Sequence, residues 1–376
     1  MKTLLILGNG FDLNCDLKSK FSDFFQTKLT TVSYNGDSGL DLKNKSKENI
    51  WYLVFLFAFF NNRLLPRETD SDVLFPSINN DDPLWMDVES YIKLIMTTSN
   101  KTLGKYMKST SEKSFLDIFE YANKERNDYK NFLSEHYQFL RLQMHFIINE
   151  EIKKGKTMAE YLYHQLKAFE DDFRNYILKE LKNNESDYNA KSKALLKEFR
   201  EYKGEYLYIL SFNYTSPGAS VNDTMNHVHG DLHSSTIIGY DSSEISSSNN
   251  PSLMLTKGWQ KLFLGSHNAS LPDKETINCI KFYGHSLGEQ DYSYFHALFD
   301  YYDVYSRSVT LIFYYSEYED TPEKNETIRA NYISKVYALL DKYVEESEKE
   351  NKRRTFTSRL QLENRLKIKK IQSSKE

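Results

Sequence analysis

The sequence predicts an α/β protein whose core is a Rossmann-like, mostly parallel sheet, discontinuous along the chain and interrupted by a large helical insertion. Three observations predict it. A short apolar run opens the chain and is followed by a glycine turn and a helical pattern. Further strand patterns return only after Gly204. The long stretch between them has few glycines and the periodicity of amphipathic helices.

The first element is the run KTLLIL at Lys2–Leu7, which is typical of a parallel strand buried on both faces. The glycine turn GNGFDLN follows it. Apolar side chains then recur at three- and four-residue steps from Leu13 to Leu29, as on one face of a helix. Residues 1–39 are therefore predicted as a strand, a tight turn and a helix, which form the first part of a nucleotide-binding α/β core.

Residues 40–203 are predicted as the helical insertion. Segments 132–154 and 158–183 combine abundant charge with helical periodicity, and these patterns indicate several amphipathic helices. Polar loops are expected at 79–83 and 183–186.

Residues 204–345 are predicted to complete the core. Strand-like apolar runs occur at 206–212, 236–240, 278–283 and 309–315. A helix is expected at 292–302, and Thr321 and Pro322 are typical of the N-cap and first turn of a further helix.

The C-terminal segment 346–376 is predicted as a basic helical or frayed tail. From Asn351 onward it contains nine Lys or Arg and two Glu. A solvated chain end is the simpler interpretation, and an electrostatic contact with nucleic acid or an acidic partner is the alternative. The whole chain has a net charge of -4 and so lacks the basic footprint of a nucleic-acid-binding protein.

Composition indicates a cytoplasmic protein without a membrane span. Two cysteines are too few for a disulfide framework or a cysteine-rich zinc site. The N-terminal apolar run breaks at Gly8, which does not fit a signal peptide. The most apolar stretch, Ile50–Phe60, is well short of the ~20 residues that span a bilayer, so a buried helix is predicted there. Aromatic residues make up 15% of the chain and favour interfaces as well as cores, so a homodimer is expected.

Four short polar motifs stand beside predicted strand ends, and the first contains Gly8, Asn9, Gly10 and Asp12. A glycine turn between a strand and a helix lets the backbone approach a phosphate, and N–H groups at the helix start can bind it. The match to a dinucleotide fingerprint is partial, because Leu13 stands where a third glycine would be needed. A simple tight turn is the alternative.

The second motif is Asn213, directly after the strand pattern YLYILSF. In open α/β sheets ligands bind at the carboxyl ends of strands. A carboxamide there can hold a ribose hydroxyl or a water molecule. An asparagine that only closes a turn is the alternative.

The third motif holds three histidines, His227, His229 and His233, with Asp231 as the only carboxylate among them. They could bind a metal, or one could act as a general base while the others are structural. We favour the general base and expect no metal, because cysteine is absent and carboxylate is scarce in this segment. Gly230 would leave room for a ligand beside His229, which we therefore choose as the base.

The fourth motif contains Gly284, Ser286 and Asp291. Gly284 permits close approach, Ser286 can donate to phosphate or ribose, and Asp291 can accept ribose hydroxyls or cap the next helix. The same segment, GHSLG, also fits the nucleophile elbow of hydrolases, with Asp303 and His296 as the nearby acid and base. That alternative is the weaker one, because both residues would lie on or near the following helix.

A resemblance to the AbiH family of bacteriophage abortive-infection proteins is carried by LLILGNGFDLNCDLKSKFSDFF, WMDVES, FEDDFRNYI, SFNYT, HVHG and FYGHSLGEQDYSYF. It extends over most of the chain, to about Tyr315. The opening and GHSLGEQD are its more specific parts. The chain departs at NCDLKS, where family members usually have a His-Gly-Leu-Pro-Thr-like stretch, and this weakens any role for Asn14 and Cys15.

The order of the four motifs is similar to that in sirtuin-like NAD-binding domains of bacterial defence systems. This similarity implies that Asn213 positions the nicotinamide ribose and a water, and that His229 is the catalytic base. The expected protein is a phage-defence effector that responds to a phage-derived trigger. It would bind NAD or an ADP-ribosyl nucleotide and hydrolyse NAD to nicotinamide and ADP-ribose.

Two alternative functions remain open. The first is a metal-dependent nuclease, in which Asp12, Asp87 and Glu89 would gather a divalent cation. The second is a sensor or assembly partner that binds the nucleotide without turnover.

Overall fold

The computed structural model of the chain describes residues 2–29, 49–52, 55, 88–89, 92, 154–155, 157–202, 204–218, 220, 223–241, 251–265, 271–319, 321–345 and 355–371. The chain divides into two compact units. The first, the sheet unit, comprises Met1–Ser19, Arg174–Ile237 and Lys261–Glu376. The second, the helical unit, comprises Lys20–Phe173 and Ile238–Gln260.

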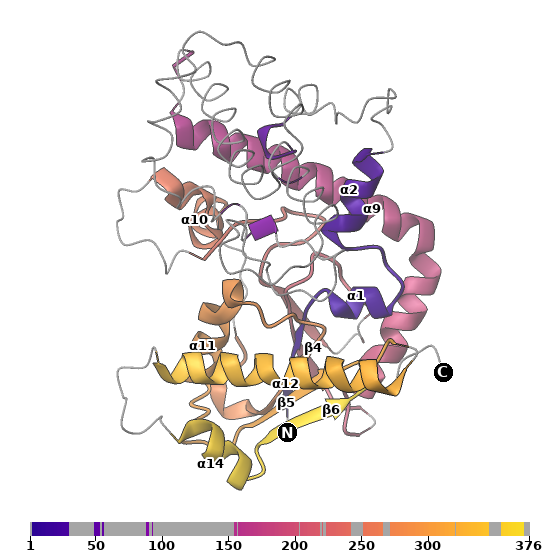
Figure 1. Cartoon of the computed structure of the whole chain (residues 1–376), viewed down its shortest axis with the longest axis vertical. Helices are drawn as coiled ribbons and strands as arrows, with labels where there is room; N and C mark the ends of the chain where they lie inside the picture. Colours follow the sequence, from indigo (N-terminus) through magenta and orange to yellow (C-terminus); the bar gives the residue numbers. More distant parts are fainter. Residues whose placement is uncertain are drawn as a thin grey trace, which may run out of the picture. The chain divides into compact units, whose positions relative to one another are not determined.

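The sheet unit is built on six parallel strands (Figure 1). They are β1 (Lys2–Leu7), β2 (Leu207–Ser211), β3 (Thr224–His227), β4 (Ile277–Tyr283), β5 (Thr310–Tyr315) and β6 (Leu366–Lys370). Their order is β3-β2-β1-β4-β5-β6, which is the Rossmann order of a doubly wound sheet. The predicted fold class and the central position of β1 are confirmed.

The register brings several strand ends to the same edge of the sheet. Leu7 of β1 pairs with Ser211 of β2 and with Tyr283 of β4, and Ser211 pairs with His227 of β3. The residues that directly follow these four strands therefore form one edge, called the carboxyl edge below. The strand order reverses between β1 and β4, which is where ligands bind in sheets of this kind.

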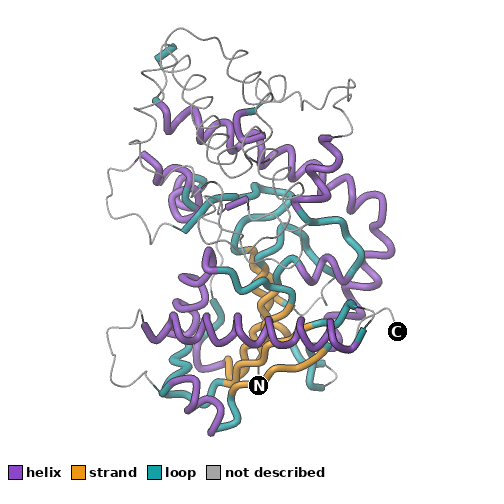
Figure 2. Tube along the Cα trace, viewed as in Figure 1, coloured by secondary structure: helices purple, strands orange, loops and turns teal. Residues whose placement is uncertain are grey.

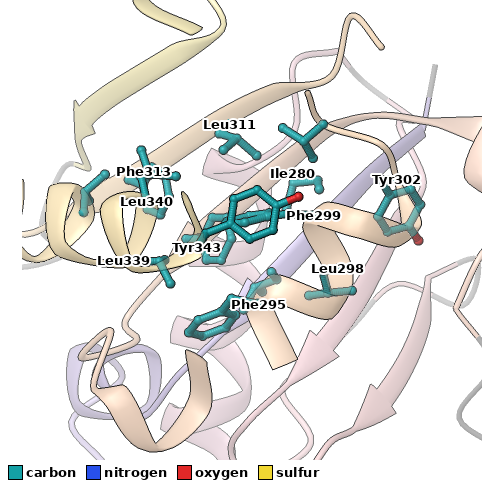
Figure 3. Close-up of a cluster of buried hydrophobic side chains, with 14 of the residues drawn as sticks. Ile280, Phe295, Leu298, Phe299, Tyr302, Leu311, Phe313, Leu339, Leu340 and Tyr343 are labelled. Carbon is teal, nitrogen blue, oxygen red and sulfur yellow. The ribbon is translucent and has the colours of Figure 1, made fainter. Parts of the chain in front are cut away.

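One side of the sheet is covered by helices that bury aromatic and leucine side chains (Figure 3). Phe295 and Phe299 come from α11 (Tyr292–Tyr301), and Leu339 and Leu340 come from α12 (Pro322–Glu345). They converge with Phe313 of β5, and all five side chains are fully buried. Figure 2 shows α12 crossing over the strands in this view, and α12 contacts β5. The helices predicted at 292–302 and from Pro322 are confirmed.

Helix α9 (Met158–Glu198) brings further residues to the sheet unit from its C-terminal part. It is regular except at Asn184, where φ is -129° and ψ is 19°. This kink divides α9 into two helices within the segment predicted as a loop at 183–186, but the break is confined to that one residue and no extended loop forms. The Tyr176 hydroxyl donates to the carbonyl of Lys18 at 2.9 Å, which fixes this part of α9 beside the N-terminal turn.

The helical unit has its own aromatic core. Phe24 and Phe25 of α2 (Phe21–Leu29) contact Phe169 of α9, at ring-centroid distances of 5.8 and 6.1 Å. Phe55 contacts the same ring at 4.8 Å. Such pairs add ~0.5–1.5 kcal/mol each beyond the area that they bury.

Two details at the start and middle of the chain differ from prediction. The helix predicted from Leu13 to Leu29 is two helices, α1 (Gly10–Asn14) and α2. Asp16 between them has φ 58°, a left-handed conformation that ends α1 and that aspartate adopts more easily than most residues. The strand predicted at 236–240 does not form. The backbone of this segment forms hydrogen bonds outside the sheet. For example, the N–H of Ile238 donates to the Glu170 carboxylate at 2.8 Å.

Two strands were not predicted. β3 has the polar sequence TMNH, and β6 lies in the segment predicted as a basic helical or frayed tail. In the structure that segment contains α14 (Phe356–Leu362) followed by β6, which pairs with β5. β6 reads LKIKK, so lysine alternates with apolar residues as is typical of a protected edge strand.

Some expectations fall outside the described residues, namely the loop at 79–83, nearly all of segment 132–154 and most of Ile50–Phe60. Residues 50–52 and 55 of the last segment are helical and buried. Among the helices of the described part, none combines the length and the apolar character that a bilayer span needs.

Candidate functional site

The loops after β1 and β4 interlock at the carboxyl edge. The N–H of Gly8 donates to the carbonyl of Tyr283 at 3.0 Å, and the N–H of Gly10 donates to the carbonyl of Gly284 at 2.7 Å. A Cβ on Gly8 would lie 2.4 Å from the Cα of His285. These glycines are therefore needed for contact between two backbones. In this conformation a pyrophosphate would have to bind other donors than these two N–H groups.

Asp12 of α1 is buried in a cluster of hydroxyl donors. Its carboxylate accepts from the Tyr188 hydroxyl at 2.7 Å and from the Thr215 hydroxyl at 2.7 and 2.9 Å. Only 2% of the residue is exposed. Burial raises the pKa of Asp12 to about 6, while the hydrogen bonds from Tyr188, Thr215 and Asn213 oppose that shift.

Replacing Asp12 with asparagine should change how stability depends on pH. The pKa of Asp12 is about 6 in the folded protein, against an ordinary value of 3.8, so the folded state binds more protons between these limits. Asp12 therefore makes the free energy of unfolding fall as the pH rises through this window, by up to about 3 kcal/mol. The asparagine of Asp12→Asn cannot titrate. Between pH 4 and pH 7, the free energy of unfolding of this variant should therefore rise relative to that of wild type by about 3 kcal/mol.

Urea denaturation at several pH values measures this difference. Asp16→Asn is a matched control, because Asp16 lies just after α1 with an exposed side chain paired to Lys191 at 2.8 Å. Asparagine also tolerates the left-handed backbone of that position. Parallel curves for wild type and Asp12→Asn would contradict the perturbed pKa of Asp12.

Asn213 follows β2 and is 6% exposed. Its side-chain N–H donates to the carbonyl of Gly8 at 3.0 Å, which ties the end of β2 to the turn after β1. The side-chain oxygen of Asn213 is buried and has no hydrogen-bond partner among the described residues. Leaving such a group unsatisfied costs ~1–3 kcal/mol, which a ligand hydroxyl or a water could recover. The neighbouring Asn9 instead binds Ser19 through its side chain.

The three clustered histidines separate in space. His227 ends β3, where its Nδ1 donates to the carbonyl of Asn213 at 2.9 Å and its Nε2 lies 3.2 Å from the Ser216 hydroxyl. His233 is exposed on the following turn. His229 is 5% exposed and lies beyond the end of β3. Among the described residues no group of three His, Cys, Asp or Glu has the arrangement of a metal site.

His229 belongs to a second cluster, with buried His285 and partly buried Asp291. The Nε2 of His229 lies 3.1 Å from Asp291 Oδ1, and the Nε2 of His285 lies 3.2 Å from Asp291 Oδ2. His285 is 7% exposed. The ring of Phe212 meets both imidazoles edge-on, at centroid distances of 5.3 and 4.8 Å. Asp291 precedes α11, but its carboxylate binds the two histidines rather than capping that helix.

Ser286 has an exposed side chain in the loop between β4 and α11. The residue with a left-handed backbone is Leu287, with φ 53°, and not the serine. A nucleophile elbow would place the serine itself at the strained position. His296, the base suggested for that alternative, is buried between Tyr292 and Tyr343 at centroid distances of 5.7 and 5.3 Å. The backbone conformation of Ser286 and the packing of His296 therefore do not fit a hydrolase elbow.

The predicted site residues thus form two hydrogen-bonded clusters of the sheet unit. Asp12, Asn213 and the Gly8 turn belong to one, and His229 and Asp291 belong to the other. Sequence reasoning missed Tyr188, which lies in α9 and belongs to no motif. It also missed His285, although His285 lies within the fourth motif, between Gly284 and Ser286.

Two of the three carboxylates suggested for a nuclease, Asp12 and Glu89, lie among the described residues. Glu89 belongs to the helical unit, where it pairs with Lys257 at 2.6 Å. Asp12 belongs to the sheet unit, and Asp87 lies outside the described residues.

Comparison with known proteins gives one finding. A family model described as "Bacteriophage abortive infection AbiH" matches residues 4–315, which include every candidate site residue named above. Among curated proteins and among solved structures, no significant match is found.

Proposed function

The chain belongs to the AbiH family of bacteriophage abortive-infection proteins, and we propose that its sheet unit acts in that defence by binding NAD or a related ADP-ribosyl nucleotide. The proposed reaction is hydrolysis of NAD to nicotinamide and ADP-ribose. The observation that carries the proposal is the pair of buried His229 and partly buried Asp291 at the carboxyl edge of a sheet in the Rossmann order. A buried imidazole held by a carboxylate is the arrangement of a general base.

Two features favour a nucleotide as the ligand. Ligands of doubly wound sheets bind where the strand order reverses, which here is between β1 and β4. The buried side-chain oxygen of Asn213 beside Gly8 needs a donor, and a ribose hydroxyl or a water held on the ribose would supply one. The exposed hydroxyl of Ser286 is the proposed donor to the phosphates.

In the proposed reaction a water molecule attacks the anomeric carbon of the nicotinamide ribose. The bond from that carbon to the nicotinamide nitrogen breaks, and the electron pair of the bond stays with nicotinamide. The water loses one proton to His229, so NAD and water give nicotinamide, ADP-ribose and a proton. Asn213 aligns the ribose and the water, and Asp291 holds the imidazole of His229.

Incubation of purified protein with NAD, with and without phage lysate, tests the proposal through the release of nicotinamide. Turnover supports it. Binding of ADP-ribose without turnover would instead support the non-catalytic sensor. Absence of both binding and turnover would overturn the proposal, and metal-dependent cleavage of tRNA or DNA would favour the nuclease.

Asn213→Ala should lower kcat/KM for NAD by ~10²-fold, because the variant loses the group that orients the ribose and the water. It should also cost about 1 kcal/mol of stability through the lost bond to Gly8. Asn14→Ala is a matched control, since Asn14 donates to the Tyr283 hydroxyl at 2.8 Å and so loses a comparable bond. Equal turnover in the two variants would remove Asn213 from the site.

A further inference from the structure

We infer that His285 is a positioning residue, which fixes Asp291 and, through Asp291, selects the Nδ1 atom of His229 as the basic nitrogen. The catalytic consequence rests on the proposed function, but the positioning itself does not.

The backbone sets the tautomer of His285. The N–H of Leu287 points at His285 Nδ1 over 2.9 Å. A backbone N–H can only donate, so Nδ1 must carry a lone pair. In the neutral imidazole the proton then sits on Nε2, which is the atom 3.2 Å from Asp291 Oδ2.

The hydrogen-bond partner of His229 fixes its tautomer in the same way. A carboxylate only accepts, so Asp291 Oδ1 receives a proton from the atom 3.1 Å away, the Nε2 of His229. The proton of neutral His229 is therefore held on Nε2, and its lone pair is on Nδ1. Without the bond from His285, the carboxylate of Asp291 would lose the second anchor that keeps its two oxygens in this orientation.

The loop that sets this arrangement is held in place by the core. Leu287 adopts φ 53°, a left-handed conformation that is unfavourable for residues other than glycine. Its side chain is 2% exposed and belongs to the hydrophobic cluster of the sheet, which offsets this unfavourable conformation. Phe212 contacts both imidazole rings edge-on and limits their rotation.

Two substitutions of His285 separate positioning from packing. In His285→Gln the side-chain amide N–H reaches as far as Nε2 and can still donate to Asp291. In His285→Asn the shorter amide replaces only the Nδ1 side of the ring, so the bond to Leu287 can persist while the bond to Asp291 is lost. Nitrogen NMR of the imidazole of His229, recorded without NAD, reports its tautomer directly.

We expect His229 to carry its proton on Nε2 in wild type and in His285→Gln, and to become a mixture of tautomers in His285→Asn. Turnover of NAD should fall about 10–100-fold in His285→Asn, mainly in kcat, and stay within about threefold in His285→Gln. The corresponding variants of His296, which is buried in α11 among tyrosines, control for the loss of a packed histidine. They should leave the His229 spectrum unchanged.

An unchanged His229 tautomer in folded His285→Asn would overturn the inference, as would equal losses in His285→Asn and His285→Gln. Failure of the proposed function is a different result, because the NMR readout needs no NAD. A protein without turnover whose His229 changes tautomer in His285→Asn alone would keep the positioning and refute the hydrolysis.

Discussion

His229→Ala is expected to abolish NAD turnover and phage defence while the protein remains folded. The variant lacks the nitrogen that accepts the proton of the attacking water, and loss of a general base costs ~10²–10⁴-fold in rate. Asp291 keeps its contact with His285, so its carboxylate is not left without a donor. The release of nicotinamide measures the rate, plaque counts measure defence, and circular dichroism checks the fold.

His227→Ala is the matched control, because it removes a neighbouring histidine with a structural contact. Its Nδ1 holds the carbonyl of Asn213 at 2.9 Å, so the variant should lose about 1 kcal/mol of stability and retain most of its turnover. Equal loss of activity in the two variants, together with loss of a bound metal in either, would show a metal site. The assignment of His229 as base would then be wrong.

Gly230→Ala is expected to have the largest effect on folding. A Cβ on Gly230 would lie 1.8 Å from the carbonyl oxygen of Ser235, and the backbone there has φ 79°. The turn after His229 cannot accommodate that atom without moving its backbone. We expect a loss of more than ~4 kcal/mol in the free energy of unfolding, or insoluble protein.

Gly204→Ala provides the comparison for this prediction. Gly204 also has a positive φ, 90°, but a Cβ there meets no described atom within 4 Å. It should cost only the left-handed backbone penalty of ~1–2 kcal/mol. Urea denaturation distinguishes the two variants. If both lost the same stability, the close contact between Gly230 and Ser235 would not exist in solution. The close approach of Ser235 to Gly230 also contradicts the prediction that Gly230 leaves room for a ligand beside His229.

Of the four strands that the sequence reveals, β1, β4 and β5 are buried along nearly all of their length, whereas β2 alternates between buried and half-buried residues. β1 and β5 show continuous apolar runs, as is typical of strands in a parallel sheet that is covered on both faces. The edge strands β3 and β6 carry polar residues or alternating lysines, and such short patterns are not distinguishable from loops or helix ends. Edge strands need less apolar surface, so their pairing is decided by neighbours far along the chain.

The candidate site shows a similar division. Asn213 is visible because it directly follows a strand pattern, where ligands of α/β sheets bind, and His229 is visible because three histidines fall within seven residues. Their partners are not visible, because the contact from His229 to Asp291 joins residues 62 positions apart. Tyr188 reaches Asp12 from a helix 176 positions away. Only the strand order and the path of α9 bring these side chains together.

The strand order also affects the chain while it is being made. β1 lies between β2 and β4, yet about 200 residues separate it from the first of these partners. At ~5–20 residues per second, the ribosome needs about 10–40 s to add them. During that time the apolar segment of β1 lacks the two strands that will pair with its edges. Unpaired apolar strands favour aggregation. The yield of soluble protein on overexpression therefore depends on translation speed and on chaperones that shield β1, and not only on the stability of the finished sheet.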